Sequence, residues 1–195
     1  MDDSHTAYSG TDLLEVLADA KNYNAFLERL VRRHAVPGEM LLDFGAGIGT
    51  FAGRLAQAGH PVTAVEPDAN QRGMIAGHGL RPVANLAALP SASIAYAYSL
   101  NVLEHIQDDV GALRELHRVL APGGRLMIYV PALSILWTRM DDRVGHLRRY
   151  DRRSLTTALR AAGGSVSSGS ALSFSACIPE RRQSSSRCHT SIDPP

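Results

Sequence analysis

Three glycines at alternate positions, Gly45, Gly47 and Gly49, follow the apolar run Met40–Phe44 and precede a segment with helical spacing. Glycine weakens both strands and helices, so three of them indicate a sharp turn of the backbone or the close approach of a ligand. In an open parallel sheet, ligands bind beyond the carboxyl ends of the strands. Three alternatives fit the pattern: a dinucleotide site, a site for a nucleoside sulfonium, and a tight strand-to-helix turn without a ligand.

An acidic residue, Glu66, ends the next apolar segment, PVTAVEP. A carboxylate at this place can accept hydrogen bonds from both hydroxyls of a ribose, which favours an adenosine-containing ligand. The structural alternative is an exposed glutamate at a strand end. The dinucleotide fingerprint GxGxxG is not met, because Thr50 stands where its last small residue belongs. A nicotinamide-dependent oxidoreductase is therefore the weaker alternative.

The elements that must position these residues alternate along the chain. Helical periodicity over 11–36 predicts one or two helices, and apolar runs then alternate with amphipathic segments. Such alternation predicts an α/β fold: a doubly wound, mainly parallel sheet with helices on both faces. We expect strands at 40–44, 61–66, 93–100 and 125–130, a weak strand at 80–83, and helices at 50–58, 68–76 and 108–120, with a turn at APGG.

Composition excludes several classes of protein. The 195 residues carry a formal net charge of +1, which gives no electrostatic reason to expect a nucleic-acid partner. We expect no secretory signal and no membrane span, because no run of apolar residues is long enough. The two cysteines, Cys177 and Cys188, suggest neither a zinc site nor a disulfide scaffold. We therefore expect no metal, and we expect a cytoplasmic protein.

A set of motifs in fixed order carries a family resemblance over about residues 22–163: LLDFGAGIG, VTAVEPD, ANLAALP, SLNVLEHIQDD, LHRVLAPGGRLMIYVPAL and GHLRRYDRRSLTTALRAAG. In these motifs the chain resembles the class I S-adenosylmethionine-dependent methyltransferases, and is most similar to the broad bacterial group that acts on small molecules (type 11/12-like). The resemblance implies a Rossmann-like fold, S-adenosylmethionine as cofactor and a small-molecule acceptor. Whether an oxygen, nitrogen or carbon atom is methylated stays open.

The resemblance also implies roles for residues. The methionine end of the cofactor should be held near the elbow, the ribose by the strand-end acid, the adenine by the two following loops, and the sulfonium above the fourth strand. The corresponding residues are Asp43, Gly45, Ala46, Gly47 and Gly49 for the methionine end, Glu66 for the ribose, Pro67, Asp68, Asn85 and Leu86 for the adenine, and Ser99, Leu100 and Asn101 beneath the sulfonium. Asn85 replaces the family's usual aspartate, and loop punctuation is its structural alternative.

Whether the acceptor needs a general base stays open; for an oxygen or nitrogen acceptor that does, the candidates are His105, His146, Tyr150 and Asp141. Each has a structural alternative, such as helix packing for His105 or an exposed loop position for His146. Five arginines between 143 and 153 make an anionic acceptor one possibility, and a solvated face with aspartate counter-ions the other.

Three regions are expected: an N-terminal helical lid (1–36), a cofactor-binding core (37–163) and an atypical, poorly ordered tail (164–195). The serine-rich tail lacks the pattern of the family's final antiparallel strand, which we expect to be missing or irregular. An unpaired sheet edge would then favour self-association. The tail also motivates an alternative function, a truncated and non-catalytic cofactor-binding remnant.

Overall fold

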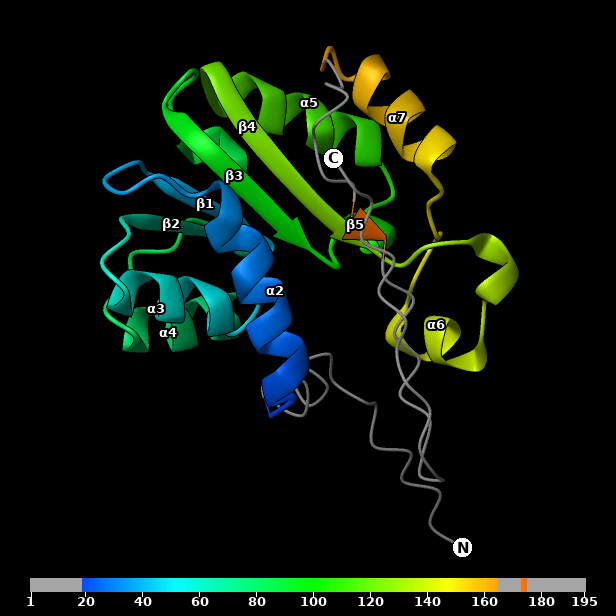
Figure 1. The fold of residues 1–195 in the computed structure, drawn as a ribbon, viewed down its shortest axis with the longest axis horizontal. Helices are drawn as coiled ribbons and strands as arrows, with labels where there is room; N and C mark the ends of the chain where they lie inside the picture. Colours follow the sequence, from blue (N-terminus) through cyan, green and yellow to red (C-terminus); the bar gives the residue numbers. More distant parts are fainter. Residues whose placement is uncertain (1–18, 165–172, 175–195) are drawn as a thin grey trace, which may run out of the picture.

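The computed structural model describes residues 19–164 and 173–174. They form a sheet in the order β2-β1-β3-β4-β5, in which all neighbouring strands pair in parallel (Figure 1). The strands are β1 (Leu41–Phe44), β2 (Val62–Val65), β3 (Ile94–Leu100), β4 (Leu120–Val130) and β5 (Ser173–Phe174). The expected doubly wound, parallel architecture is thereby confirmed.

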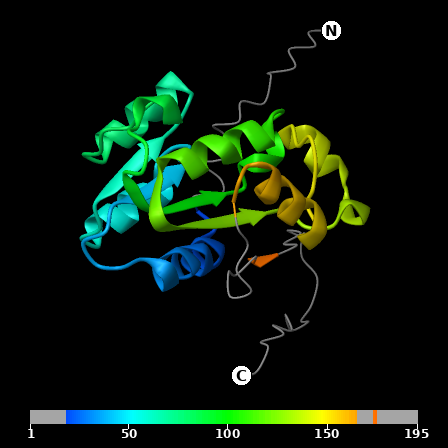
Figure 2. The ribbon, with the colours of Figure 1, turned by 90° about the horizontal axis from the view of Figure 1, so that it is seen from above.

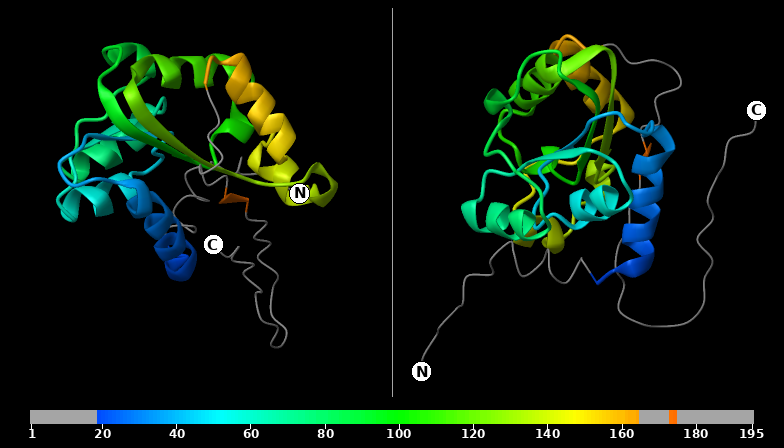
Figure 3. Two further views of the ribbon diagram at one scale, coloured as in Figure 1. Left: turned by 45° about the horizontal axis from the view of Figure 1, so that its top comes forward. Right: turned by 90° about the vertical axis from the view of Figure 1, so that its left-hand side faces the viewer.

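Helices cover both faces of the sheet (Figures 2 and 3). One face is covered by α2 (Lys21–His34) and α3 (Thr50–Gln57), and the opposite face by α5 (Asp109–Val119) and α7 (Arg152–Ala161). The remaining elements are α4 (Ala69–Gly77), α6 (Arg139–Val144) and the short 3-10 helices η1 (Leu86–Ala88), η2 (Leu103–His105) and η3 (Ser134–Leu136).

Two hydrophobic clusters hold these layers together. Because successive side chains of a strand point to opposite faces, Leu41 packs toward α2 and α3 while Leu42 packs toward α5. The same alternation separates Met127 from Ile128 in β4. Both faces are therefore buried, which is why these strands read as continuous apolar runs in the sequence.

Several expected boundaries differ in the structure. The expected strand at 80–83 is a single parallel bridge between Val65 and Val83. The APGG segment, expected to be a turn before the strand at 125–130, lies within β4 instead. This strand begins at Leu120, and its pairing with β3 is irregular there. A positive φ of 76° at Gly123 permits this irregularity, because glycine adopts such a conformation without strain. Among the described residues, none of the helices is long and apolar enough to cross a membrane.

The two ends of the chain are described only in part. Helix α2 falls within the expected lid (1–36), whose first 18 residues lie outside the described part. The expected tail (164–195) also lies outside it, apart from Gly164 and β5. Strand β5 pairs with β4 in parallel at Tyr129 and Val130 only, and no antiparallel pair occurs among the described strands.

Candidate cofactor site and acceptor side

The glycine elbow connects β1 to α3 and is fastened to β2. The backbone N–H groups of Gly45 and Ala46 both donate to the carbonyl of Val65, at 2.9 and 3.1 Å. Gly45, Gly47 and Gly49 have φ values of 78°, 55° and 84°, a region that residues with a Cβ enter only with strain. The elbow thus brings the carboxyl ends of β1 and β2 together.

Two of these glycines also make room for the protein itself. A Cβ on Gly45 would lie 2.4 Å from Val102 Cγ2, and one on Gly49 would lie 3.0 Å from Ile75 Cγ1. At Gly45, packing against Val102, the second residue after β3, is by itself enough to require a glycine. Gly47, the central glycine of the elbow, donates its backbone N–H to the side chain of Glu66.

Glu66 binds the elbow directly. Its side chain is buried, with 6% exposure, so the alternative of an exposed strand-end glutamate is wrong. Oε2 accepts from the backbone N–H of Gly47 at 2.8 Å, and Oε1 accepts from that of Asp68 at 3.0 Å. Each carboxylate oxygen can accept a second hydrogen bond, so the group retains capacity for two hydroxyl donors.

The loop after Glu66 begins α4. Asp68 caps this helix by accepting from the N–H of Gln71 at 2.9 Å. The carbonyl of Pro67 accepts from the Arg72 guanidinium. Both Pro67 and Asp68 are exposed beside Glu66, as a binding loop for the adenosine part of a ligand requires.

Two buried polar atoms at the carboxyl ends of β1 and β3 have no hydrogen-bond partner among the described residues. They are Oδ2 of Asp43 and Oγ of Ser99, on side chains that are 3% and 0% exposed. Burial raises the pKa of Asp43 to about 7 with a smaller contribution from the charge of Glu66, although the nearby hydroxyl of Tyr98 and the backbone of Ala52 act to lower it. Unpartnered polar groups of this kind are rare in proteins and commonly mark a ligand site. Asp43 is therefore a candidate for binding a donor group of a ligand.

The remaining expected cofactor residues lie in three different environments. Asn85 is exposed immediately before η1, whereas the side chain of Leu86 packs in the hydrophobic core. Leu100 is half-buried at the end of β3. Asn101 has a φ of 54°, donates its N–H to the carbonyl of Tyr129 at 2.7 Å, and donates its side-chain amide to the Tyr23 hydroxyl at 3.1 Å. This last contact links α2 to the end of β3.

Two of the expected catalytic residues lie together beyond β3. The imidazole rings of His105 and His146 are 4.8 Å apart, centre to centre. Nδ1 of His146 lies 2.8 Å from Oδ1 of Asp141, a third residue of the expected set. Burial and the neighbouring His146 lower the pKa of His105, so this imidazole is neutral at physiological pH.

Asp141 is held as a carboxylate. Although burial opposes ionisation, bidentate bonds from Arg149 at 2.7 and 2.8 Å and the bond with His146 hold the pKa of Asp141 well below its usual range. An ionised Asp141 accepts a hydrogen bond from the N–H at Nδ1 of His146. The Nε2 atom of a neutral His146 then carries the lone pair.

Glu104 was missed by the sequence-based reasoning. Its side chain is completely buried, and neither carboxylate oxygen has a hydrogen-bond partner among the described residues. Burial raises the pKa of Glu104 to about 8. Oε1 lies 3.9 Å from Nε2 of His146. The available signal was an acidic residue inside the apolar stretch NVLEHI, directly after a buried strand.

Tyr150 does not offer a free hydroxyl. It is 3% exposed, and its oxygen lies 2.7 Å from Oδ2 of Asp109 and 3.3 Å from the carbonyl of Leu103. Burial and the hydrogen bond with Asp109 raise its pKa above the ordinary range of a tyrosine. These contacts contradict a role as base and give Tyr150 a structural one between α5 and η2.

Two of the five arginines of this region are paired with carboxylates of the chain. Arg149 binds Asp141, and Arg148 lies 3.0 Å from Asp109. Arg143, Arg152 and Arg153 are exposed. This arrangement favours the solvated face with counter-ions over an anionic acceptor.

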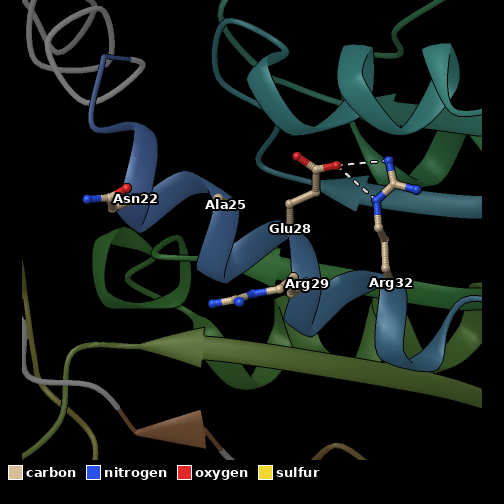
Figure 4. Close-up of a pocket in the computed structure, with 5 residues that line it drawn as sticks. All are labelled: Asn22, Ala25, Glu28, Arg29 and Arg32. Atoms are coloured by element: carbon tan, nitrogen blue, oxygen red, sulfur yellow. Dashed lines mark hydrogen bonds and ion pairs between the residues drawn. The ribbon is translucent and has the colours of Figure 1, made fainter.

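A groove on the surface of α2 is separate from these features. Figure 4 shows its lining residues: Asn22, Ala25, Glu28, Arg29 and Arg32. Glu28 and Arg32 form an ion pair of 2.8 Å across it, one helical turn apart. None of the five belongs to the expected cofactor or catalytic residues.

Residues 16–168 match the family model of the methyltransferase domain. The chain belongs to this methyltransferase family. The fold and the polar atoms gathered at the carboxyl ends of β1, β2 and β3 agree with that membership. The expectation from the motifs is therefore confirmed at the level of the family.

Curated relatives of the chain are named for different reactions. The chain is 32% identical over 136 residues to the ubiquinone/menaquinone biosynthesis C-methyltransferase UbiE of Rubrivivax gelatinosus, covering 66% of this chain and 54% of the relative. It is 32% identical over 116 residues to the malonyl-[acyl-carrier protein] O-methyltransferase of Serratia marcescens, covering 54% and 46%. The chain thus spans about half the length of these relatives.

Solved structures share the fold. The putative methyltransferase of Haloferax volcanii, in complex with the Trm112 activator, matches with a TM-score of 0.65 at 16% identity, covering 79% of this chain and 74% of that one. Phosphoethanolamine N-methyltransferase 2 of Haemonchus contortus, in complex with S-adenosyl-L-methionine, matches with a TM-score of 0.61 at 21% identity, covering 82% and 42%.

Proposed function

We propose that this protein transfers the methyl group of S-adenosylmethionine to a small-molecule acceptor. Membership of the methyltransferase family supports the reaction class. The observation that carries the cofactor assignment is the unpartnered, buried Oδ2 of Asp43 beside an elbow that is hydrogen-bonded to Glu66. When bound, S-adenosylmethionine supplies an electrophilic methyl group on a sulfonium, from which a neutral thioether departs as the leaving group.

The residues of the elbow divide the recognition of this cofactor between them. Asp43 binds the ammonium group of the methionine end through its unpartnered oxygen, and Ser99 offers a second polar atom nearby. Glu66 binds the ribose hydroxyls, already oriented by the N–H groups of Gly47 and Asp68. Pro67, Asp68, Asn85 and Leu86 form the adenine side, a role that rests on the family's motifs alone.

Helix α2 and the histidine pair contribute to the acceptor side. Tyr23 reaches Asn101 at the end of β3, so α2 can close this side of the site as a lid. His105 follows β3 and His146 follows β4 along the chain. Their imidazoles are the groups that activate the acceptor. Orienting the acceptor and excluding water are the protein's main tasks in such a displacement, because proximity supplies several kcal/mol.

Isothermal titration with S-adenosylhomocysteine and with NADH tests this function. We expect the thioether to bind and NADH not to bind. Binding of NADH alone would overturn the assignment in favour of an oxidoreductase. If the thioether binds and a screen of phenolic, amine and carboxylic acceptors with labelled cofactor shows no transfer, the non-catalytic remnant becomes the better description. A cytoplasmic location stays a prediction.

A further inference from the structure

Glu104, His105 and His146 form a cluster that the family's methyl-transfer chemistry does not by itself require. One potential ligand atom from each of them lies within 4.8 Å of the other two. Glu104 comes from the interior, and both its carboxylate oxygens are buried without partners among the described residues. A buried carboxylate needs a proton or a cation as its counter-charge, because the isolated anion is strongly destabilised away from water.

A second shell already orients one ligand of this cluster. His146 is fixed through Nδ1 by Asp141, at 2.8 Å, so that Nε2 faces Oε1 of Glu104 at 3.9 Å. Asp141 is fixed in turn by Arg149. A carboxylate that binds the far nitrogen of a histidine is the usual support of a metal-ligating imidazole, since it sets the tautomer and strengthens the ligand.

The backbone holds the two halves of the cluster in register. The N–H of Leu147, next to His146, donates to the carbonyl of Glu104 at 2.8 Å. The loop after α6 is thereby attached to η2, so the approach of His146 to Glu104 is part of the fold.

We propose that Glu104, His105 and His146 bind one divalent first-row transition-metal ion on the acceptor side of the site. One carboxylate and two imidazoles suit Zn²⁺, Co²⁺, Mn²⁺ or Fe²⁺ and leave coordination positions open. Bound ligands lie about 2.0–2.2 Å from such an ion, so the cluster must close slightly around it. His105 is the most exposed of the three residues, so it is the ligand placed to make that movement. The expectation of no metal rested on the two cysteines, which take no part in a site made of one carboxylate and two imidazoles.

This ion would activate the acceptor, a role that rests on the proposed function. An acceptor with a hydroxyl or enol oxygen could bind an open position and release its proton to solvent water at lower pH, because a metal ion stabilises the oxyanion. Glu104 lies three residues beyond Asn101, at the end of the strand that is expected beneath the sulfonium. His105 and His146 would then act as metal ligands and not as bases.

The full chain, stripped with EDTA and desalted, is titrated with CoCl2 and followed by visible absorption and calorimetry. We expect one Co²⁺ per chain, with the visible bands of an ion bound by nitrogen and oxygen. Glu104→Gln and His146→Ala should each weaken binding by about 10–100-fold or more. His117→Ala, which changes an exposed histidine on α5, should leave it unchanged. Circular dichroism and S-adenosylhomocysteine binding check that each variant is folded.

The outcomes separate the ion from the proposed function. Co²⁺ binding that persists in Glu104→Gln would indicate other ligands, such as Cys177 or Cys188, and would overturn the site. No binding in the parent protein would also overturn it. If Co²⁺ binds at the cluster but the thioether does not bind, the site stands and the proposed function fails. With both bound, Co²⁺ should broaden the proton signals of the methionine end of S-adenosylhomocysteine more than those of the adenine; equal or absent broadening would contradict the acceptor-side position.

Discussion

Oε2 of Glu66 accepts a hydrogen bond of 2.8 Å from the backbone N–H of Gly47, which joins the end of β2 to the centre of the glycine elbow. The residue expected to bind ribose therefore also shapes the loop expected to hold the methionine end. Substitution of Glu66 should affect both parts of the cofactor.

Glu66→Ala should remove most affinity for S-adenosylhomocysteine. Hydrogen bonds to a charged group contribute about 1.5–3 kcal/mol each, so the Kd should rise at least about tenfold. Calorimetry measures the change, and thermal unfolding reports the loss of the contact with Gly47. Glu115→Ala, at a partly exposed glutamate on α5, is the matched control. Unchanged affinity in a folded Glu66→Ala protein would place the ribose elsewhere.

Gly45→Ala should destabilise the protein more than Gly79→Ala. The two glycines have φ values of 78° and 79°, so both variants pay the same left-handed strain of about 1–2 kcal/mol. Only at Gly45 does the added Cβ collide with Val102, whereas nothing lies within 4 Å at Gly79. Overpacking should add about 1–3 kcal/mol to the loss of unfolding free energy, measured with urea. The double variant Gly45→Ala/Val102→Ala should recover part of it; no recovery would show that the collision is not the cause.

Asp43 should make stability and cofactor affinity depend on pH in opposite directions. Its pKa is raised to about 7 in the folded state, so between pH 4 and 7 the folded protein holds a proton that the unfolded chain has lost. The contribution of Asp43 to unfolding free energy should therefore fall as the pH rises through this window and stay constant above it. A shift of this size corresponds to roughly 4 kcal/mol at most.

Binding of S-adenosylhomocysteine should strengthen over the same window, because its ammonium group favours the carboxylate form of Asp43. The groups near Asp43 are Glu66, which raises its pKa, and the buried Tyr98, which stays protonated here. Asp43→Asn should remove most of the pH dependence of binding, but only the share of the pH dependence of stability that belongs to Asp43, because the raised pKa of Glu104 acts over an overlapping range. Urea unfolding and calorimetry at pH 5, 6, 7 and 8 can establish both. An unaltered dependence in this variant would assign it to another group.

Arg149→Ala should destabilise the fold far more than Arg148→Ala. Loss of Arg149 leaves the buried Asp141 carboxylate without its bidentate partner, a change that typically costs about 3–5 kcal/mol. Arg148 and its partner Asp109 are partly exposed, so that pair should contribute about 1 kcal/mol or less. Thermal unfolding compares the two variants. Small and equal losses of stability in the two variants would contradict this prediction. They would favour a role for Arg149 in binding an anionic acceptor.

Self-association, expected from an unpaired sheet edge, should involve the exposed apolar residues after β4. Ile135 is 90% exposed, and Leu133, Met140 and Leu147 in the same stretch of the chain are nearly half exposed. Ile135→Asp should lower the apparent mass at high concentration in light scattering after gel filtration. Val36→Asp, at an equally apolar site beyond α2, serves as control. A monomer at every concentration would remove the basis of this prediction.

The sequence by itself determined the order of strands and helices, the elbow at Gly45–Gly49 and the acid at the end of β2. These features are local: apolar periodicity sets the type of an element, and glycine marks a backbone with positive φ. Their assembly at one edge also followed, because parallel strands bring their carboxyl ends together. The family's motifs added the cofactor.

Only the tertiary structure decided which side chains beyond β3 meet. The path of the chain after β4 brings His146 back to Glu104, and no local pattern predicts where a loop of that length returns. The same holds for Val102 against Gly45, and for the hydroxyl of Tyr150, which packing directs to Asp109. Burial was also decided by the tertiary structure alone. Nothing in the sequence distinguishes Glu104 and Asp43 from other acids, and their pKa values are raised because the fold excludes water around them.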